Sequence, residues 1–357
     1  MSNNHGASSV GERIKQPVDG YDGVPRDTQN RVFCGTSLLL CEREFCKMQS
    51  AIIVAHQVVM MFLLTMVGVF CSKKGILTEG VARYLSTFLL NVALPGIMLS
   101  SLYRPMQDEL LAGFGLTFLL AVILHLLAIL ASRLLICTRS GQACRTERFG
   151  IIYANAAYMA IPLIRATLGE DSTFYATAFV SVFLLFHWTQ GVTELGGSIN
   201  PKKLLYNPCI LSVVLGLLVF GFQIPIPNPV IDTVRLVGGL TTPLSMIITG
   251  VFLADLKLSD LKSLRMYWAA LLRTVVVPLA GIAIVVALGA ADWFIGAETA
   301  CLAAIYCFSC PSAVSVILLS ASLGTEVLYP SSLVAVTTVI SLVALPAIAV
   351  VANMLLV

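Results

Sequence analysis

Two prolines interrupt long apolar stretches of this sequence and decide what chemistry those stretches can do. Pro162 lies within Phe149–Gly169, and Pro311 lies in a later apolar stretch. A proline cannot donate a backbone hydrogen bond, so Pro162 deprives the carbonyl of Tyr158 of its helical partner. Inside a membrane, unpaired backbone is tolerated only where it is buried in protein or lines a wet cavity. We therefore expect two broken helices that cross near the membrane midplane and form a transport site.

The residues beside these prolines are suited to binding an anion. Proline favours the first position of a helix, so each proline can begin a half-helix whose first amides, such as those of Ile164 and Ala313, are free to donate. The start of such a half-helix also carries up to about half a positive charge. The alternative is that both prolines only kink packed helices. The predicted substrate-binding residues are Asn155, Met159, Pro162, Leu163, Ser309, Pro311, Ser312 and Ser315.

A second pair of interrupted stretches carries Pro95 and Pro243. Pro95 frees the carbonyl of Asn91, and Pro243 frees that of Gly239. Such carbonyls can bind a cation or mark the hinges of a scaffold. We favour a scaffold, because no carboxylate within the membrane accompanies them. The candidate scaffold or ion-lining residues are Asn91, Pro95, Thr242, Pro243 and Ser245.

Few ionisable side chains fall within the apolar stretches. His125, His187 and Arg273 are candidates for proton coupling or for attracting an anion. His187 adjoins Trp188 and Gln190 near one membrane face, which favours packing at the interface over a proton relay. Arg273 can snorkel to the interface or pair with a carboxylate, and contact with substrate is the less favoured alternative.

The elements that must position these residues are membrane helices. Hydrophobic residues make up 58% of the 357 and charged residues only 11%, against about 25% charge in soluble domains. The runs free of Asp, Glu, Lys and Arg are Ser50–Ser72, Tyr84–Tyr103, Leu110–Ser132, Phe149–Ile164, Ser172–Thr193, Leu204–Ile231, Leu236–Ala254, Thr274–Ala291, Thr299–Thr325 and Val327–Val357. Most of them reach the ~20 residues that a bilayer core requires of a helix. We expect an all-α membrane protein with ten transmembrane helices.

Composition also argues against other classes of protein. The net charge of +3 is small and gives no sign of nucleic-acid binding. Cys307 and Cys310 form a C-x-x-C motif, but it falls within the membrane with no second pair nearby, which favours helix packing over zinc or redox chemistry. No metal cluster or Ser/His pair of an intramembrane enzyme falls within the spans. We expect no enzyme activity, no cofactor and no metal.

Two proline spacings indicate an internal repeat. Pro95 and Pro243 are 148 positions apart, and Pro162 and Pro311 are 149 apart. Five helices per copy is an odd number, so the second copy must enter the membrane from the opposite side, as in the inverted repeats of secondary transporters. The predicted divisions are a polar, disordered tail over residues 1–48, a first five-helix repeat over 49–200 and a second over 201–357.

Basic residues are distributed unevenly between the loops. The loops after even-numbered spans hold only Arg104, Arg165 and Arg235. The loops after odd-numbered spans hold Lys73, Lys74, Arg83, Arg133, Arg139, Arg145, Arg148, Lys202, Lys203, Lys257, Lys262 and Arg265. Because basic loops stay in the cytoplasm, both termini should face outward. Arg43 and Lys47 argue weakly against this orientation, although Glu42 and Glu44 stand beside them.

Several motifs resemble the auxin efflux carriers of plants and their bacterial relatives, which include malonate and malate permeases. The matching stretches are NVALPGIMLSSL, NAAYMAIPLIRATLG, NPCILSVVLGLLVF, TTPLSMIITGVFLADL and the proline-containing ninth span. They keep their order over roughly residues 50–355; one departure is Ala160, where the family often has glycine. The resemblance implies ten spans, crossing broken helices 4 and 9, and transport of small organic anions.

The leading hypothesis is a secondary active transporter that moves a mono- or dicarboxylate across the plasma or inner membrane by alternating access, with export the favoured direction. The alternatives are a carrier for a cationic or neutral solute, and a membrane receptor or scaffold with the same fold. The expected partners are a small organic anion, membrane lipids and a coupling ion that is either a proton or sodium. A homodimer is compatible with the sequence, and nucleic acid is not expected.

The distribution of basic residues makes the orientation testable. Single cysteines placed in the Lys202–Lys203 loop of a cysteine-free variant should resist an impermeant thiol reagent applied to intact cells, because this loop is expected in the cytoplasm. Cysteines placed beside Arg104 should react under the same conditions. Labelling of the Lys202–Lys203 loop from outside would reverse the predicted orientation.

Overall fold

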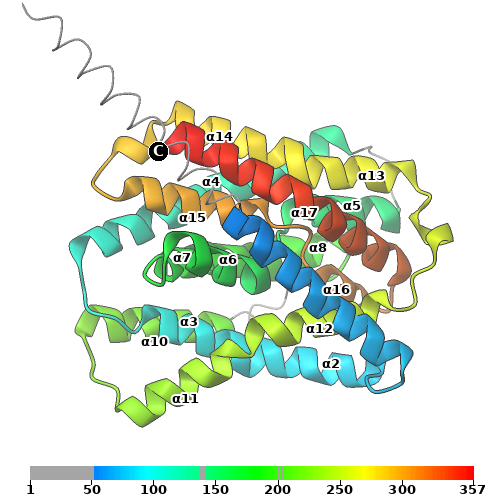
Figure 1. Ribbon diagram of the computed structural model, residues 1–357, viewed down its shortest axis with the longest axis horizontal. Coiled ribbons are helices and arrows are strands. Elements are labelled where there is room, and N and C mark those ends of the chain that lie inside the picture. Colours follow the sequence, from blue (N-terminus) through cyan, green and yellow to red (C-terminus); the bar gives the residue numbers. More distant parts are fainter. Residues whose placement is uncertain (1–51, 137–140, 200–201, 203–204) are drawn as a thin grey trace, which may run out of the picture. The chain divides into compact units, whose positions relative to one another are not determined.

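The computed structural model describes residues 52–136, 141–199, 202 and 205–357, and its regular elements within these ranges are all helices, without a strand (Figure 1). The predicted all-α class is therefore confirmed for this part of the chain. The tail that we expect to be disordered, residues 1–48, lies outside the described residues.

The first half of the described chain runs from Ile52 to Ile199. Its helices are Ile52–Lys73, α2 (Glu79–Phe88), α3 (Leu94–Leu102), α4 (Asp108–Leu135), α5 (Gln142–Ile152), α6 (Ile161–Leu168), α7 (Thr173–Phe186) and α8 (Val192–Glu194). Three π-helical turns join some of them, at Leu89–Ala93, Ala156–Ala160 and His187–Gly191.

The second half has the same character. Its α-helices are α10 (Pro208–Phe222), α11 (Asn228–Gly239), α12 (Thr241–Leu253), α13 (Leu264–Leu271), α14 (Val277–Ala287), α15 (Ala297–Ser309), α16 (Ser315–Ser322) and α17 (Leu328–Leu356). A π-helical turn at Leu272–Val276 joins α13 to α14, and short 3₁₀ turns occur at Leu258–Leu261 and Ala290–Asp292.

Six of the helices in the described ranges are long and apolar enough to cross a membrane. They are Ile52–Lys73, Glu79–Leu102, Asp108–Leu135, Asn228–Leu253, Leu264–Ala287 and Leu328–Leu356. Three shorter apolar helices, Ala156–Leu168, Pro208–Phe222 and Ala297–Ser309, fall below the length that a bilayer core requires. Two of these three are short because an interruption bounds them: Ala156–Leu168 begins after one, and Ala297–Ser309 ends at another. Length alone therefore does not recover ten spans.

Local sequence explains where some helices begin. The side chain of Asn207 accepts a hydrogen bond of 2.9 Å from the amide of Cys209, which caps the start of α10. Pro208 occupies the first turn, where a missing amide costs nothing because that amide would have no helical partner. The Thr78 hydroxyl caps α2 in the same way, accepting from the amide of Val81 at 3.4 Å.

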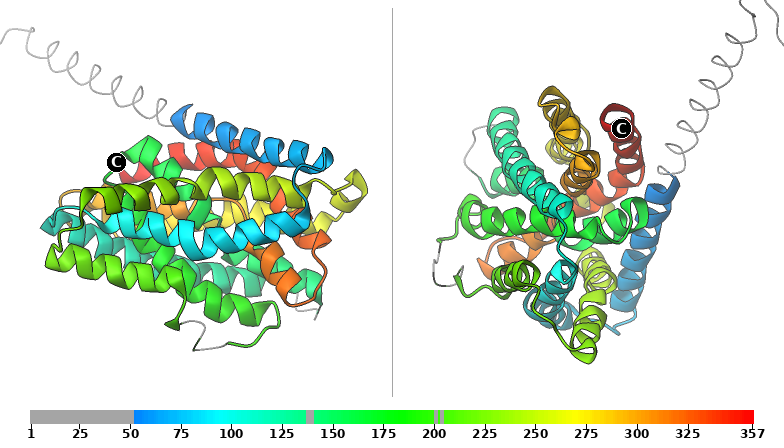
Figure 2. Two further views of the ribbon diagram at one scale, coloured as in Figure 1. Left: turned by 90° about the horizontal axis from the view of Figure 1, so that it is seen from below. Right: turned by 90° about the vertical axis from the view of Figure 1, so that its left-hand side faces the viewer.

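The helices divide into two bundles. The small bundle contains Ile52–Lys73, α2, α3, α10, α11 and α12, and α3 packs against both α10 and α11. The large bundle contains α4 to α8 and α13 to α17, with α4 packed between α7 and α15. In Figure 1, α2, α3, α10 and α11 of the small bundle lie below α6 and α7, and α13, α14, α15 and α17 of the large bundle lie above them. Figure 2 shows the same helices from two further directions.

Glycine pairs let the helices of the small bundle approach closely. A Cβ atom on Gly250 of α12 would lie 2.0 Å from the carbonyl oxygen of Thr65 and 2.8 Å from the Cα of Gly68, in the helix Ile52–Lys73. A Cβ on Gly238 of α11 would lie 2.7 Å from the amide nitrogen of Ile97 in α3. Small residues at such contacts supply the van der Waals packing that holds helices together in lipid.

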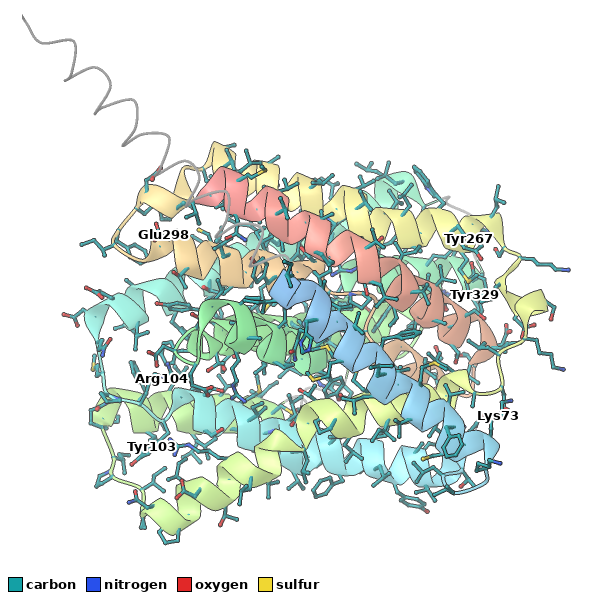
Figure 3. All side chains as sticks on the ribbon, viewed as in Figure 1. Lys73, Tyr103, Arg104, Tyr267, Glu298 and Tyr329 are labelled. Atoms are coloured by element: carbon teal, nitrogen blue, oxygen red, sulfur yellow. The ribbon has the colours of Figure 1, made fainter. Side chains whose placement is uncertain are left out.

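Loops gather at two opposite ends of the helices. At one end, Lys73 lies 3.5 Å from Asp255, and at the other, Arg104 lies 3.1 Å from Asp171. Figure 3 labels Lys73, Tyr267 and Tyr329 at the first end and Tyr103, Arg104 and Glu298 at the second. Lys73 ends the helix Ile52–Lys73, and Asp255 follows α12. Helices far apart in the sequence therefore end on the same side of the molecule.

The close contact at Gly250 can be tested by adding a single methyl group. Gly250→Ala should lower the melting temperature of the purified protein, because overpacking costs about 1–3 kcal/mol. Gly115→Ala in α4 is the matched control, since its Cβ would meet nothing within 4 Å, and alanine adds about 0.5–1 kcal/mol of helix stability. Equal melting temperatures for the two variants would show that α12 does not depend on this approach.

Candidate functional site

Two interruptions of helix lie side by side in the large bundle. The first, Tyr153–Asn155, separates α5 from the π-helical turn that begins at Ala156, and the second, Cys310–Val314, separates α15 from α16. The amide of Asn155 donates to the carbonyl of Pro311 at 2.7 Å, and the amide of Ala313 donates to the carbonyl of Tyr153 at 2.9 Å. We call this antiparallel pairing the crossing. It lets each interruption satisfy backbone groups of the other.

Ser312 is committed to holding the crossing together. Its hydroxyl donates to the carbonyl of Gly150 at 2.9 Å, and its amide donates to the hydroxyl of Thr337 in α17 at 3.3 Å. The amide of Ala313 is taken by Tyr153, as described above. The expectation that the amide of Ala313 is free to donate to a substrate is therefore wrong, because the other interruption already uses it. The amide of Ser312 is likewise taken, by α17.

Arg273 supports the crossing from the π-helical turn between α13 and α14. Its side chain is fully buried, and its Nη1 donates to the carbonyl of Ile151 at 2.9 Å. Nε and Nη2 donate to the carbonyl of Cys310 at 3.0 and 2.8 Å, and Nη2 also donates to that of Phe308. Arg273 thus binds the carboxyl ends of both α5 and α15. From the sequence we expected Arg273 to snorkel or to pair with a carboxylate. Instead it is fully buried, and it forms no ion pair with any of the residues that the structure describes.

Pro162 does not begin a half-helix. The first interruption ends at Asn155, seven positions earlier, and the chain runs helically from Ala156 through Leu168. The carbonyl of Tyr158 does lack its helical donor, and the hydroxyl of Thr242 in α12 takes that place at 3.2 Å. The amides of Leu163 and Ile164 thus lie within a helical segment and not at its start, because a π-helical turn and a neighbouring hydroxyl compensate for the proline.

The same arrangement recurs at two other prolines. The π-helical turns Leu89–Ala93, Ala156–Ala160 and Leu272–Val276 each end two positions before a proline, at Pro95, Pro162 and Pro278 respectively. The wider turn accommodates the missing donor without breaking the helix. Only Pro311, among these four prolines, stands in an interruption.

A cavity of about 940 Å³ lies between the two bundles beside the crossing. The large bundle contributes Asn155, Tyr158, His187 and Ser315 to its wall. The small bundle contributes residues of α2, the π-helical turn after it, α3 and the start of α10, including Arg83, Asn91 and Cys209. Apolar side chains such as Leu94, Phe183 and Leu318 line much of the remainder. Cavities of this size hold small organic molecules.

Only some of the residues predicted for substrate binding line the cavity. Asn155 and Ser315 line it, as does Asn91 from the scaffold group. Met159, Pro162, Leu163, Ser309, Pro311 and Ser312 are not part of its lining, nor are Pro95, Thr242, Pro243 and Ser245. The hydroxyl of Ser309 donates instead to the carbonyl of Ile305 within its own helix, at 2.6 Å. The candidate site thus contains fewer residues than the sequence motifs suggested.

Two buried polar atoms in the wall of the cavity lack a partner among the described residues. They are Oδ1 of Asn155 and Nδ1 of His187, and each side chain is only 4% exposed. Nε2 of His187 lies 2.8 Å from the hydroxyl of Ser315, which joins the end of α7 to the start of α16. From its neighbours Trp188 and Gln190 in the sequence, we expected His187 to pack near a membrane face. A histidine inside an apolar span was the available signal for this position.

His125 has a different role from His187. Its Nδ1 lies 2.7 Å from the carbonyl of Ala121 in its own helix, and its ring packs against those of Phe179 and Phe186. It is buried and does not line the cavity. His125 therefore belongs to the packed core of the large bundle.

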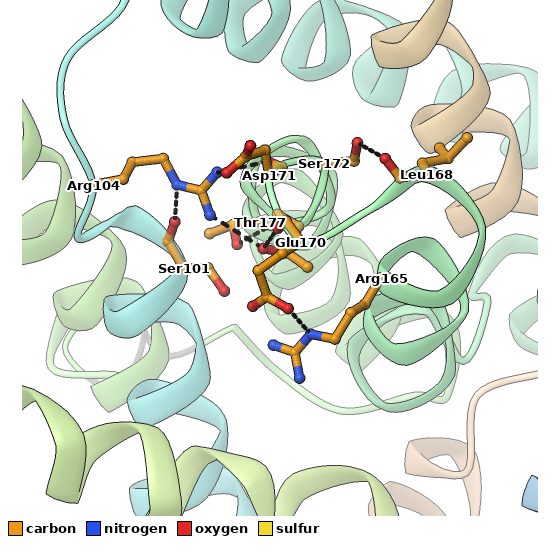
Figure 4. A network of polar contacts seen from close by, with 9 residues as sticks. Ser101, Arg104, Arg165, Leu168, Glu170, Asp171, Ser172 and Thr177 are labelled. Carbon is orange, nitrogen blue, oxygen red and sulfur yellow. Dashed lines mark hydrogen bonds and ion pairs between the residues drawn. The ribbon is translucent and has the colours of Figure 1, made fainter.

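At the end of the helices that holds Arg104, a polar network joins the two bundles (Figure 4). Arg104, after α3, donates to the backbone and side chain of Asp171, before α7, at 2.8 and 3.1 Å. Arg165 lies 2.7 Å from Glu170 in the same network. Burial lowers the pKa of Arg104, and the charge of Asp171 opposes that shift. The cavity and this network thus involve opposite ends of the bundles.

Paired helix interruptions beside a cavity between two helix bundles define an integral membrane protein of the transporter class. A family model described as "Membrane transport protein" matches residues 53–200 and again residues 197–349. The chain belongs to this family, the auxin efflux carriers, as the sequence motifs indicated. It is a membrane transporter, and the family is not one of enzymes. A comparison with curated proteins found no match to the chain.

The contact between Thr242 and Tyr158 can be tested with a double-mutant cycle. Thr242→Val should lower the melting temperature, because an unpaired buried carbonyl costs about 1–3 kcal/mol. Pro162→Ala restores an amide four residues after Tyr158, so Thr242→Val should cost less in that background. Thr249→Val is the control, because the Thr249 hydroxyl donates to Ser245 within α12. Equal costs of Thr242→Val in both backgrounds would contradict this account of Pro162.

Proposed function

We propose that this membrane transporter is a secondary carrier for a small organic anion, a mono- or dicarboxylate, and that the cavity beside the crossing is its substrate site. The observation that carries the proposal is the pair of unpartnered polar atoms, on Asn155 and His187, in an otherwise largely apolar wall. A buried polar group without a partner costs free energy unless a ligand or water satisfies it.

The helix geometry favours an anion. The helical segment Ala156–Leu168 and helix α16 both begin at the crossing, and Ala157 and Ser315 near these starts line the cavity. The first amides of a helix have no partner within it, and the helix start carries about half a positive charge. Rotation of the Asn155 carboxamide exchanges Oδ1 and Nδ2, so the same place can offer a donor to a carboxylate.

The charges around the cavity support the same choice. None of the described residues that line it is acidic, while Arg83 of α2 is part of its wall. A cationic solute would therefore meet no compensating carboxylate there, which disfavours the alternative of a cation carrier. The apolar side chains Leu94, Phe183 and Leu318 are suited to the carbon skeleton of an organic acid.

Ten membrane spans in two inverted five-helix repeats remain our proposal for the topology. The two ranges matched by the family model divide near residue 200, where we place the boundary between the repeats. The cavity includes Arg83 and Ser198, which belong to loops or helix starts that we expect on the cytoplasmic side. With that orientation, the cavity accepts substrate from the cytoplasm and delivers it outward, as export by alternating access requires. Both termini then face outward at the plasma or inner membrane.

The substrate site can be tested by transport assays with a panel of carboxylates in vesicles. Asn155→Ala and His187→Ala should each lower uptake or efflux about ten- to hundredfold, because a hydrogen bond to a charged group contributes about 1.5–3 kcal/mol. Substrate should raise the melting temperature of the wild type, and much less that of Asn155→Ala.

Asn353→Ala is the matched control for these variants. Asn353 donates to the hydroxyl of Tyr306 at 2.7 Å and does not line the cavity. This variant should lose some stability and keep its transport rate. Wild-type rates for both Asn155→Ala and His187→Ala would place the substrate elsewhere, and wild-type protein that moves none of the carboxylates would refute the substrate class.

A further inference from the structure

Arg273 is the side chain at the crossing that the proposed substrate site does not use. It is fully buried, and every hydrogen bond that its guanidinium makes goes to a backbone carbonyl at the end of an interrupted helix, on Ile151, Phe308 or Cys310. Its guanidinium also lies 5.4 Å from the ring centre of Phe308. No ion pair among the described residues includes Arg273, so the positive charge is balanced by the backbone.

The balance of charge follows from the directions of the two helices. Helix α5 ends at Ile152 and α15 ends at Ser309, and the carboxyl end of a helix carries about half a negative charge. Two such ends that meet at one point amount to roughly one negative charge. One guanidinium compensates this charge, and its planar fork lets it reach both helix ends at once.

Without Arg273, the same carbonyls would form an oxygen-lined, electronegative pocket. Unwound backbone carbonyls and the carboxyl ends of half-helices are the groups that bind sodium in many secondary transporters. We infer that Arg273 is a built-in cation that occupies the place of a bound sodium at the crossing, so that transport through this protein does not require sodium. This inference rests on the proposed carrier function and narrows its coupling ion.

Arg273 is then a positioning residue: it does not line the cavity but holds the backbone next to residues that do. Ile151 lies four positions before Asn155, and Cys310 lies five positions before Ser315. By holding these two carbonyls together, the guanidinium fixes the starts of the following half-helices, where Asn155 and Ser315 line the cavity. A coupled sodium would do the same only when bound, whereas Arg273 does so permanently.

The test compares melting temperatures of the purified full-length protein in sodium chloride and in choline chloride at equal ionic strength. The wild type should melt at the same temperature in both salts. Arg273→Ala should melt lower in choline chloride, and sodium or millimolar guanidinium should raise its melting temperature in a saturable way, because each cation can refill the vacated place. Arg273→Met, which fills the space without a charge, should melt lower and respond to neither cation.

Arg265→Ala is the matched control for the arginine variants. Arg265 lies on α13 at the end of the helices, where it pairs with Glu147 at 2.9 Å. Its loss should lower stability without any response to sodium or guanidinium. A purely structural Arg273 would behave in the same way, so cation rescue confined to Arg273→Ala separates the two roles.

Four results would overturn the inference. They are a sodium-specific rise in the melting temperature of the wild type, a wild-type melting temperature for Arg273→Ala, a destabilised Arg273→Ala that neither sodium nor guanidinium restores, and a sodium requirement for transport by the wild type. If Arg273→Ala does not fold, Arg273→Lys retains the charge and should fold with no response to sodium; a sodium response there would equally refute the inference. Failure of every carboxylate to be transported would refute the proposed function, while the melting experiments would still decide the role of Arg273.

Discussion

The structure of the large bundle depends on the mutual satisfaction of two helix interruptions. Neither Tyr153–Asn155 nor Cys310–Val314 can lie in an apolar interior alone, since each leaves backbone groups without partners. Paired with one another, they exchange two backbone hydrogen bonds, and Arg273 takes the carbonyls that remain at the helix ends. The starts of the following half-helices then lie beside the cavity. The polar features of the site therefore follow from one requirement on the backbone.

The sequence predicted much of this arrangement. Composition indicated an all-helical membrane protein, and the positions of Pro162 and Pro311 indicated two interrupted helices that meet. The prediction was wrong at Pro162 because a proline removes one donor and does not dictate how the chain compensates. Compensation came from a π-helical turn and from Thr242, a residue 84 positions from Tyr158. A sequence pattern within one span cannot reveal a partner on another helix.

The same reason limits what sequence could say about individual site residues. His187 and Ser315 are 128 positions apart in the sequence but in contact in the structure. The sequence suggested that His187 packs at the membrane interface, whereas in the structure it lines the cavity. Arg273 likewise owes its role to carbonyls on two other helices. Conversely, Ser309 lies two positions before Pro311, but its hydroxyl forms a hydrogen bond within its own helix and does not line the cavity. Proximity in sequence to an interruption is thus a weak guide to which side chains face the cavity.

The pairing at the crossing has a consequence for how the protein is made. The hydrogen bond from Asn155 to Pro311 cannot form until Pro311 is synthesised, 156 residues after Asn155. At about 5–20 residues per second, this interval lasts roughly 8–30 s. During that time the first interruption is inside or beside the membrane without its hydrogen-bonding partner. Nascent chains must therefore shelter Tyr153–Asn155, in water at the insertion machinery or against other helices, until the second half of the protein arrives.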